Sequence, residues 1–270
     1  MKKLCLTILG TGNAAVTKCY NTCFALSEGN EHFLVDAGCG NQILRILEEE
    51  NIALADIHKM FVTHGHTDHL LGVIWVVRMI SQRMNQGKYE GDFTIYCHKE
   101  LEETLRTICK LTLPGKVTKN FDSRIHFVCV ADGDEHEILG CKVKFFDIHS
   151  TKLSQYGFAL TMPSGTRFVC CGDEPYQESE REYVEGCDWM LHEAFCLYEE
   201  REKFKPYEKH HSTAKDACEL AQELGVKNLI LYHTEDKNIA CRKERYTAEG
   251  KQYFDGNLYV PDDREKFEIV

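Results

Sequence analysis

The protein has 270 residues, of which 43% are hydrophobic and 28% charged, and its 32 basic and 43 acidic residues give a formal net charge of −11. These proportions are typical of a soluble globular protein and exclude a disordered chain, a collagen and a coiled-coil rod. The acidic balance disfavours sequence-blind nucleic-acid binding, because such affinity depends on neutralising phosphates with basic residues.

The lengths of the apolar segments and the pattern of cysteines bear on the cellular compartment. The longest apolar run, residues 70–77, is far below the ~20 residues that span a membrane. The apolar stretch behind the first residues is too short for a secretory signal. The 14 cysteines are scattered and form no CxxC pair, which favours reduced thiols. We therefore expect a cytoplasmic protein without a membrane partner.

The order of elements follows from hydrophobic periodicity. Helices are predicted over residues 41–50, 70–84, 100–110 and 212–224. Strands are predicted over residues 4–9, 22–26, 32–35, 59–62, 92–97, 125–130, 136–139, 141–147, 158–162, 168–171, 188–192 and 229–232. Strands run together and helices flank them, which indicates sheets packed face to face with helices outside. No Pro- or Ser-rich linker divides the chain, so we expect one domain over residues 1–270.

The most informative segment is a His-x-His-x-Asp-His loop that follows a predicted strand and precedes an apolar helix. It contains His64, His66, Asp68 and His69. Imidazoles and carboxylates are ligands that Zn²⁺ prefers. The i, i+2 spacing lets the first two histidines converge on one ion, whereas the last two residues point to a second position. The loop therefore predicts a site for two metals.

The six-residue loop 64–69 cannot complete two metal sites by itself, so further ligands must come from other strand ends. The candidates are His149, Asp173 and His233, each of which directly follows an apolar, strand-like run. Strand ends meet at sheet edges, where ligands from distant segments can gather. Taken alone, His149 would more often be an ordinary loop histidine and Asp173 a turn residue before Pro175.

On these motifs the chain resembles the metallo-β-lactamase superfamily, and within it the ribonuclease Z-like branch of tRNA 3′-processing endonucleases. The resemblance extends over almost the whole chain. It includes the opening LTILGTGNAA, the turn LVDAGCGN and the loop VTHGHTDH. Leu191–Phe195 (LHEAF) resembles its His-Glu-Ala-Thr element, with Phe where Thr is usual. His210–Thr213 (HHST) resembles its His-Ser-Thr element.

The resemblance implies an αββα four-layer sandwich of two mixed sheets and a dinuclear-zinc phosphodiesterase that uses an activated hydroxide. Metal one would be held by His64, His66 and His149, and metal two by Asp68, His69 and His233, with Asp173 bridging. Mn²⁺ or Fe²⁺ are the other candidate metals. By the same resemblance, Asp68, Glu193 and His211 would be catalytic. His211 would protonate the leaving alkoxide, Glu193 would orient it, and Asp36 would be structural.

The interval between His149 and Asp173 departs from the usual pattern. It contains a single hairpin turned at residues 163–165, without the arm that grips tRNA in ribonuclease Z. Two other segments, 197–210 and 236–254, are candidates for a substrate wall. Phosphodiester chemistry is therefore better supported than tRNA as the substrate, and a small nucleotide diester remains an alternative.

Two other functions compete with phosphodiester hydrolysis. Lactone or thioester hydrolysis would not need the added acid that the HEAF and HHST segments provide. A metal-binding sensor on the same fold is the non-enzymatic alternative, although a His rather than a Glu at residue 66 disfavours the iron version. The sequence leaves the oligomeric state open, including a homodimer.

Overall fold

A computed structural model describes residues 3–270 and divides their strands between two seven-stranded sheets. The first sheet has the order β14-β1-β2-β3-β4-β5-β6. Its strands are β1 (Leu4–Gly10), β2 (Cys23–Glu28), β3 (Glu31–Val35), β4 (Ile57–Phe61), β5 (Phe93–Cys97), β6 (Ile125–Cys129) and β14 (Lys266–Ile269).

The second sheet has the order β13-β12-β11-β10-β9-β8-β7. Its strands are β7 (Glu135–Ile138), β8 (Cys141–Asp147), β9 (Tyr156–Thr161), β10 (Arg167–Cys170), β11 (Trp189–Glu193), β12 (Asn228–Tyr232) and β13 (Asn257–Tyr259). The hairpin of β9 and β10 fills the interval between His149 and Asp173, as the sequence predicted, with Gly165 at a φ of +91° in its turn.

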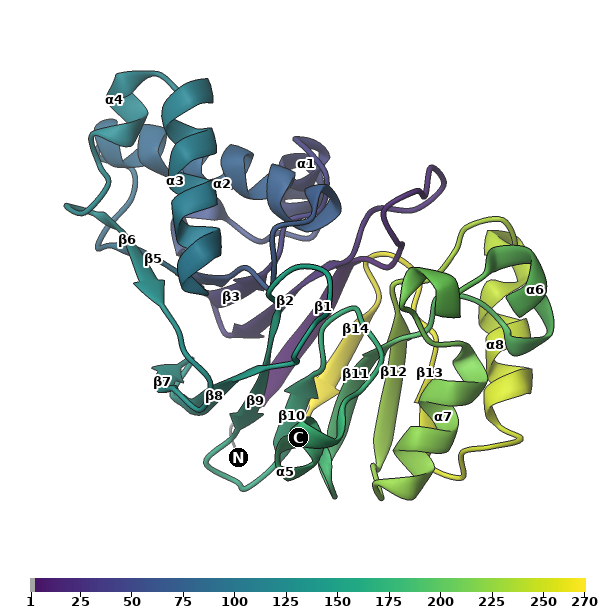
Figure 1. Cartoon of the computed structure of the whole chain (residues 1–270). Helices are drawn as coiled ribbons and strands as arrows, with labels where there is room; N and C mark the ends of the chain where they lie inside the picture. Colours follow the sequence, from purple (N-terminus) through teal and green to yellow (C-terminus); the bar gives the residue numbers. More distant parts are fainter. Residues whose placement is uncertain (1–2) are drawn as a thin grey trace.

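Helices cover the outer faces of the two sheets (Figure 1). The α-helices are α1 (Gln42–Glu49), α2 (Thr67–Asn85), α3 (Lys99–Thr112), α4 (Gly115–Thr118), α5 (Arg181–Val184), α6 (Arg201–Phe204), α7 (Ala214–Glu223) and α8 (Arg242–Gly250). Short 3₁₀ helices are η1 (Leu54–Asp56), η2 (Glu178–Glu180), η3 (Tyr198–Glu200), η4 (Tyr207–Lys209) and η5 (Ile239–Cys241). Among the described residues, no helix is both long and apolar enough to cross a bilayer.

The core between the sheets is built from the inward-facing residues of both. Phe61 on β4 packs edge-to-face on Phe158 of β9, with ring centroids 5.8 Å apart, and lies 4.8 Å from the ring of Phe145 on β8. All three rings are buried. Separate apolar clusters join each sheet to its helices. The predicted αββα sandwich of two mixed sheets is thereby confirmed.

The ends of the parallel strands determine where the functional side chains gather. Strands β3, β4, β5 and β6 run parallel in the first sheet, and β10, β11, β12 and β13 run parallel in the second. In such sheets ligands bind outside the carboxyl ends of the strands. Asp36, the His-rich loop, Asp173, Glu193 and His233 all lie at or just beyond these ends.

The predicted elements are present with shifted ends. Periodicity did not reveal the 3₁₀ helices, the one-turn helices α4, α5 and α6, or helix α8 and strands β13 and β14 near the end of the chain. Helix α8 and strands β13 and β14 are short or strongly charged, and β14 pairs with β1 from the other end of the chain. Such pairing depends on contacts between residues more than 200 positions apart, which no local pattern reports.

Candidate metal centre

The His-rich loop leaves the carboxyl end of β4 and runs directly into α2. His64 and His66 lie in the loop, and Asp68 and His69 lie in the first turn of the helix. A Cβ at Gly72 would overlap the carbonyl oxygen of Ala37, so only glycine lets α2 approach the turn after β3 this closely. The main-chain N–H of Gly72 donates to Gly38 at 2.8 Å and holds the approach.

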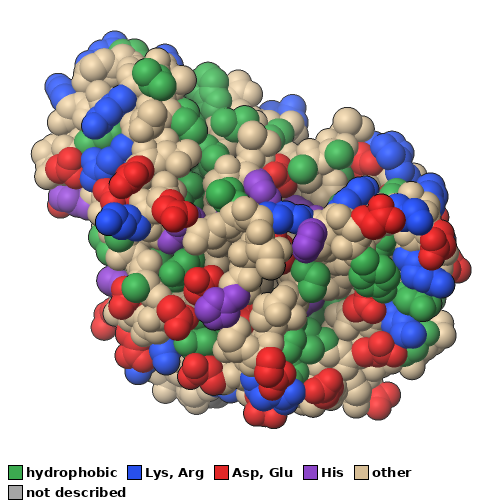
Figure 2. Space-filling model, viewed as in Figure 1, with side chains coloured by type: hydrophobic (Ala, Val, Ile, Leu, Met, Phe, Trp, Pro, Cys, Tyr) green, Lys and Arg blue, Asp and Glu red, His purple; other side chains and the backbone are tan. Residues whose placement is uncertain are grey.

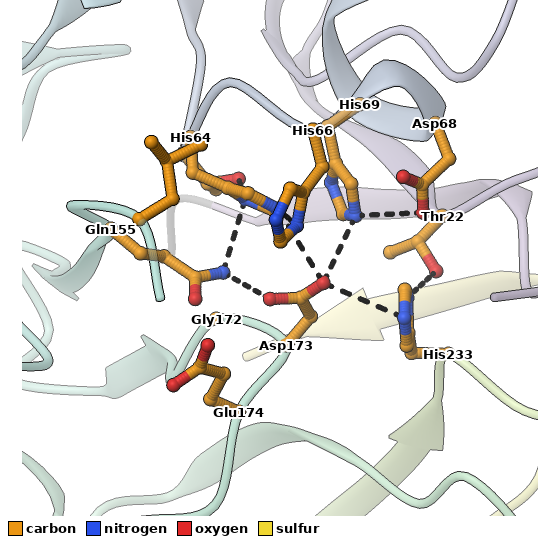
Figure 3. A network of polar contacts seen from close by, with 12 residues as sticks. Thr22, His64, His66, Asp68, His69, Gln155, Gly172, Asp173, Glu174 and His233 are labelled. Atoms are coloured by element: carbon orange, nitrogen blue, oxygen red, sulfur yellow. Dashed lines mark hydrogen bonds and ion pairs between the residues drawn. The ribbon is translucent and has the colours of Figure 1, made fainter. Parts of the chain in front are cut away.

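Six of the predicted ligands converge in two groups (Figure 3). The first group contains His64, His66 and Asp173, and the second contains Asp68, His69 and His233; within each group the candidate ligand atoms lie within 4.8 Å of one another. Oδ2 of Asp173 lies 3.6, 3.3 and 3.5 Å from Nε2 of His64, His69 and His233. Asp173 therefore faces both groups at once.

Asp36 organises the histidines from behind. His69 Nδ1 donates to Asp36 Oδ2 at 2.7 Å, and the main-chain N–H and hydroxyl of Thr63 donate to the two carboxylate oxygens at 2.9 and 2.8 Å. The hydroxyl of Thr63, 2.9 Å from His64 Nδ1, is left to accept from it. Both imidazoles thus present Nε2 to the centre, which is how ligating histidines are oriented.

His233 is oriented in the same way by a threonine that directly precedes β2 of the first sheet. The Thr22 hydroxyl lies 3.0 Å from both the carbonyl oxygen of Gly12 and Nδ1 of His233. Because its proton goes to the carbonyl, the hydroxyl accepts from Nδ1–H and leaves Nε2 free to face Asp173. Thr22 has no motif of its own, and sequence reasoning missed it.

Burial and charge determine the protonation states of these groups. Burial lowers the pKa of His64 well below its ordinary value and lowers that of His233 to about 3, so both are neutral and can act as ligands. Burial opposes ionisation of Asp173, but the contact with His69, whose own pKa is raised, holds the pKa of Asp173 well below the ordinary value. Burial also acts to lower the pKa of His69, yet Asp36, Asp173 and Asp68 raise it well above the usual range.

The donor atoms fit divalent metals. His69 Nε2 is buried without a hydrogen-bond partner and faces Asp68 at 3.4 Å and Asp173 at 3.3 Å. His64 Nε2 and His66 Nδ1 are 2.8 Å apart, so two imidazole nitrogens of the first group point at one another. Buried carboxylates and converging imidazole nitrogens form an N/O donor set that suits borderline ions such as Zn²⁺.

The structure does not bring His149 into this cluster. Its side chain is 58% exposed, and its Nδ1 lies 3.8 Å from the carboxylate of Asp147, whose other oxygen accepts from the His149 main-chain N–H. The Gln155 amide nitrogen instead contacts Asp173 and lies 3.1 Å from His64 Nδ1. The ligand role that the resemblance implied for His149 stays a prediction, and Gln155 is a site residue that the motifs did not reveal.

Glu193 and His211 lie beside the second group, as the resemblance implied. Glu193 ends β11 and is fully buried, and one of its oxygens accepts from the main-chain N–H of Ser212. Its other oxygen lies 3.5 Å from His211 Nδ1. Burial acts to lower the pKa of His211, but Glu193 outweighs it and raises that pKa. The His211 ring is 5.2 Å from that of His233.

A cavity of about 560 Å³ opens over the candidate metal centre. Its wall includes residues that the sequence analysis did not single out for this site: Asn13, Ala14, Ala15, Lys152 and Glu174. Figure 2 shows histidine and basic side chains side by side near the middle of this face. Of the two segments expected to form a substrate wall, 197–210 contributes Lys209, whereas 236–254 supplies none of the described lining residues.

Four of the nine described non-glycine residues with positive φ are candidate site residues or sequence neighbours of one. Asp36, His149, His210 and His233 have φ values of 55°, 55°, 57° and 57°. Most residues adopt this region at a cost, which is smaller for Asn, Asp and His. The Ala37 N–H donates to His69 O at 3.1 Å, one of the contacts that hold the turn after Asp36.

Comparison with known proteins agrees with this geometry. A family model described as Anti-Pycsar protein Apyc1 matches residues 4–254. The chain belongs to the Anti-Pycsar protein Apyc1 family. Ribonuclease Z of Methanothermobacter thermautotrophicus is 28% identical over 273 residues, covering 84% of this chain and 85% of that protein. This Apyc1-family chain is a metallo-β-lactamase-fold hydrolase distantly related to ribonuclease Z.

Solved structures share the fold of the Apyc1-family chain over almost its whole length. The metallo-β-lactamase fold protein YhfI from Bacillus subtilis has a TM-score of 0.78 at 18% identity, covering 98% of this chain and 99% of that one. The short form of human tRNase Z has a TM-score of 0.75 at 20% identity, again covering 98% and 99%. The resemblance inferred from the motifs is confirmed.

Proposed function

We propose that this protein is a dinuclear-metal phosphodiesterase that opens the phosphodiester ring of a cyclic nucleotide. The observation that carries the proposal is Asp173, whose carboxylate faces two ligand groups directly beside the His211–Glu193 pair. The family's anti-Pycsar name points to degradation of cyclic nucleotides. This choice favours the small-diester alternative of the sequence analysis over tRNA.

The proposed ligands of one metal are His64, His66 and Asp173. The proposed ligands of the other are Asp68, His69 and His233, with Asp173 shared. Zn²⁺ suits this donor set best, and Mn²⁺ and Fe²⁺ are the other candidates. When bound, such ions stabilise charge on phosphoryl oxygens and lower the pKa of coordinated water.

His211 is the proposed general acid. As a water oxygen forms a bond to phosphorus and releases a proton to solvent, the P–O bond to the ribose breaks, and protonated His211 transfers its proton to the departing alkoxide oxygen. Glu193, 3.5 Å from His211 Nδ1, stabilises the protonated imidazole and directs Nε2 away from itself. The product is a nucleoside monophosphate, in which the phosphate is attached to the ribose by a single ester bond.

The cavity fits a small anionic substrate. Its volume of about 560 Å³ lies within the ~300–1,000 Å³ of small-molecule sites. The Lys152 ammonium group donates to the carbonyl oxygen of Lys209, and both lysines line the cavity. Neither has a carboxylate partner among the described ion pairs. Their charge favours a phosphodiester, whereas the net charge of −11 disfavours a long polyanion.

A second candidate is tRNA 3′-end cleavage. It is favoured by the relatives named ribonuclease Z, which are similar over most of their length. The same metal centre and general acid would serve that reaction. The two candidates therefore differ in what binds outside the centre.

The test offers the zinc-loaded protein four substrates: a 3′,5′-cyclic nucleotide, bis(p-nitrophenyl) phosphate, a tRNA precursor and a lactone. We expect turnover of both small diesters, and any tRNA cleavage should be insensitive to removal of the tRNA elbow. Asp173→Asn should abolish all of these activities. Efficient, elbow-dependent tRNA cleavage without cyclic-nucleotide hydrolysis would establish the second candidate instead.

A further inference from the structure

Phe195 occupies the position where the related motif usually has Thr, and its main chain is tied to three segments. Its N–H donates to the carbonyl oxygen of Ser212 at 2.9 Å, and its own carbonyl accepts from the N–H of Glu235 at 2.8 Å and from the hydroxyl of Tyr246 at 3.3 Å. The side chain is only 8% exposed and lines the cavity. The main chain at Phe195 is therefore anchored, and its buried ring forms part of the cavity wall.

This ring stacks on the imidazole of His211. The ring centroids are 4.9 Å apart and the planes are inclined by 15°, which is nearly parallel. The Lys209 ammonium nitrogen lies 4.8 Å from the same Phe195 centroid. Phe195 therefore contacts two cavity-lining residues of the segment that leads into α7.

Glu193 by itself does not fix the plane of the His211 imidazole. A single contact of 3.5 Å between one carboxylate oxygen and Nδ1 leaves the ring free to tilt about the line that joins the two atoms. Such a tilt displaces Nε2, which lies on the far side of the ring. A stacked aromatic ring opposes the tilt, because it contacts the face of the imidazole rather than its edge.

We infer that Phe195 is a positioning residue for His211. Glu193 and Phe195 then have separate roles. Glu193 determines which nitrogen of His211 points into the cavity, and Phe195 determines the plane of the imidazole ring. Displacing a proton donor by about 1 Å can cost orders of magnitude in rate, so a modest restraint has a measurable effect. The inference rests on the proposed phosphodiesterase function only through its kinetic readout.

The experiment compares zinc-loaded Phe195→Leu and Phe195→Tyr. Leucine retains apolar volume but has no ring to stack, whereas tyrosine retains the ring. Phe195→Leu should reduce kcat on a cyclic nucleotide roughly 3- to 10-fold more than kcat on bis(p-nitrophenyl) phosphate, because only the alkoxide needs the proton. Phe195→Tyr should keep the ratio of the two kcat values at the wild-type value.

A second readout does not depend on activity. In protein labelled at the histidine rings, the carbon-bound ring protons of His211 should be shielded by the stacked Phe195 and should move downfield in Phe195→Leu but not in Phe195→Tyr. The signal is assigned by its loss in His211→Ala, which leaves 12 of the 13 histidines. Circular dichroism and zinc content verify that each variant is folded and loaded.

The outcomes separate this inference from the proposed function. Equal losses on both esters in Phe195→Leu, or an unchanged His211 signal, would overturn the positioning role and make Phe195 a packing residue. A wild-type protein that does not cleave cyclic nucleotides, yet shows the expected His211 shift, would instead overturn the proposed substrate and leave the stack established.

Discussion

Asp36 accepts a hydrogen bond of 2.7 Å from Nδ1 of His69, so a residue outside both ligand groups determines which nitrogen of His69 faces Asp173. Asp36 also receives both donors of Thr63. Three donors converge on this one carboxylate. A residue that ligates nothing itself thus holds the His-rich loop and helix α2 in register.

Asp36→Asn should weaken metal binding at the group of Asp68, His69 and His233. Asparagine tolerates the left-handed backbone at this position but offers one acceptor oxygen where two are used. Loss of such a partner typically lowers metal affinity 10- to 100-fold. Competition with a chromogenic zinc chelator measures the change, and Asp255→Asn, at an exposed residue, is the control. Unchanged affinity would show that Asp36 is dispensable for orientation.

His211→Ala should affect two substrates unequally. A positioned general acid contributes about 10²–10⁴-fold, but only where the leaving group needs a proton. We therefore expect a large loss on a cyclic nucleotide and a much smaller one on bis(p-nitrophenyl) phosphate, whose leaving group departs unprotonated. Glu193→Gln should show the same trend more weakly.

Asp68→Ala is the matched comparison for His211→Ala. It removes a candidate metal ligand and should damage both substrates alike. The measurement is steady-state kcat on the two esters. If both variants reduce kcat equally on both esters, His211 supports the metal site or the fold and is not the general acid.

Lys209→Met should raise KM for an anionic diester. The substitution keeps the aliphatic stem and removes one positive charge from the cavity wall. One charge interaction at 4 Å in water is worth about 1 kcal/mol, which corresponds to a roughly fivefold change. The increase should shrink at high salt, because exposed charges are screened. Lys203→Met, on α6 and outside the cavity, should leave KM and its salt dependence as they are.

Glu180 makes the stability of the fold depend on pH. Its carboxyl is buried, one of its oxygens has no hydrogen-bond partner, and burial raises its pKa from 4.5 to about 8. Between these two values the folded protein holds a proton that the unfolded chain has released. The Glu180 contribution to the free energy of unfolding is therefore complete below pH 4.5 and is lost as the pH rises toward 8.

Glu180→Gln should remove this contribution to the pH dependence. Its amide is neutral at every pH, so the variant should gain on the wild type as the pH is raised from 5 to 8.5, by at most about 1.4 kcal/mol per pH unit. Urea unfolding at several pH values measures the difference. Glu178→Gln, at an exposed carboxylate paired with Arg181, should show no such gain. Parallel curves for Glu180→Gln and wild type would refute the prediction.

The amino-acid sequence by itself determined the architecture and most of the candidate ligands. Periodicity of apolar residues revealed strands β1 to β12 and helices α1, α2, α3 and α7, because burial of one face imposes a local repeat. His64, His66, Asp68 and His69 were recognisable because they lie within six positions of one loop. Asp173 and His233 could be placed because parallel strands bring their carboxyl ends to the same edge.

Only the tertiary structure decided which side chains actually converge. His149 follows a strand as the other candidates do, yet it faces solvent, and the side chain of Gln155 contacts both Asp173 and His64. Phe195 and Lys209 belong to the site because the segment before α7 lies against the end of β11, where both residues line the cavity beside His211. The direction of a side chain beyond a strand end depends on backbone angles and contacts with distant segments, and neither leaves a periodic signal in the sequence.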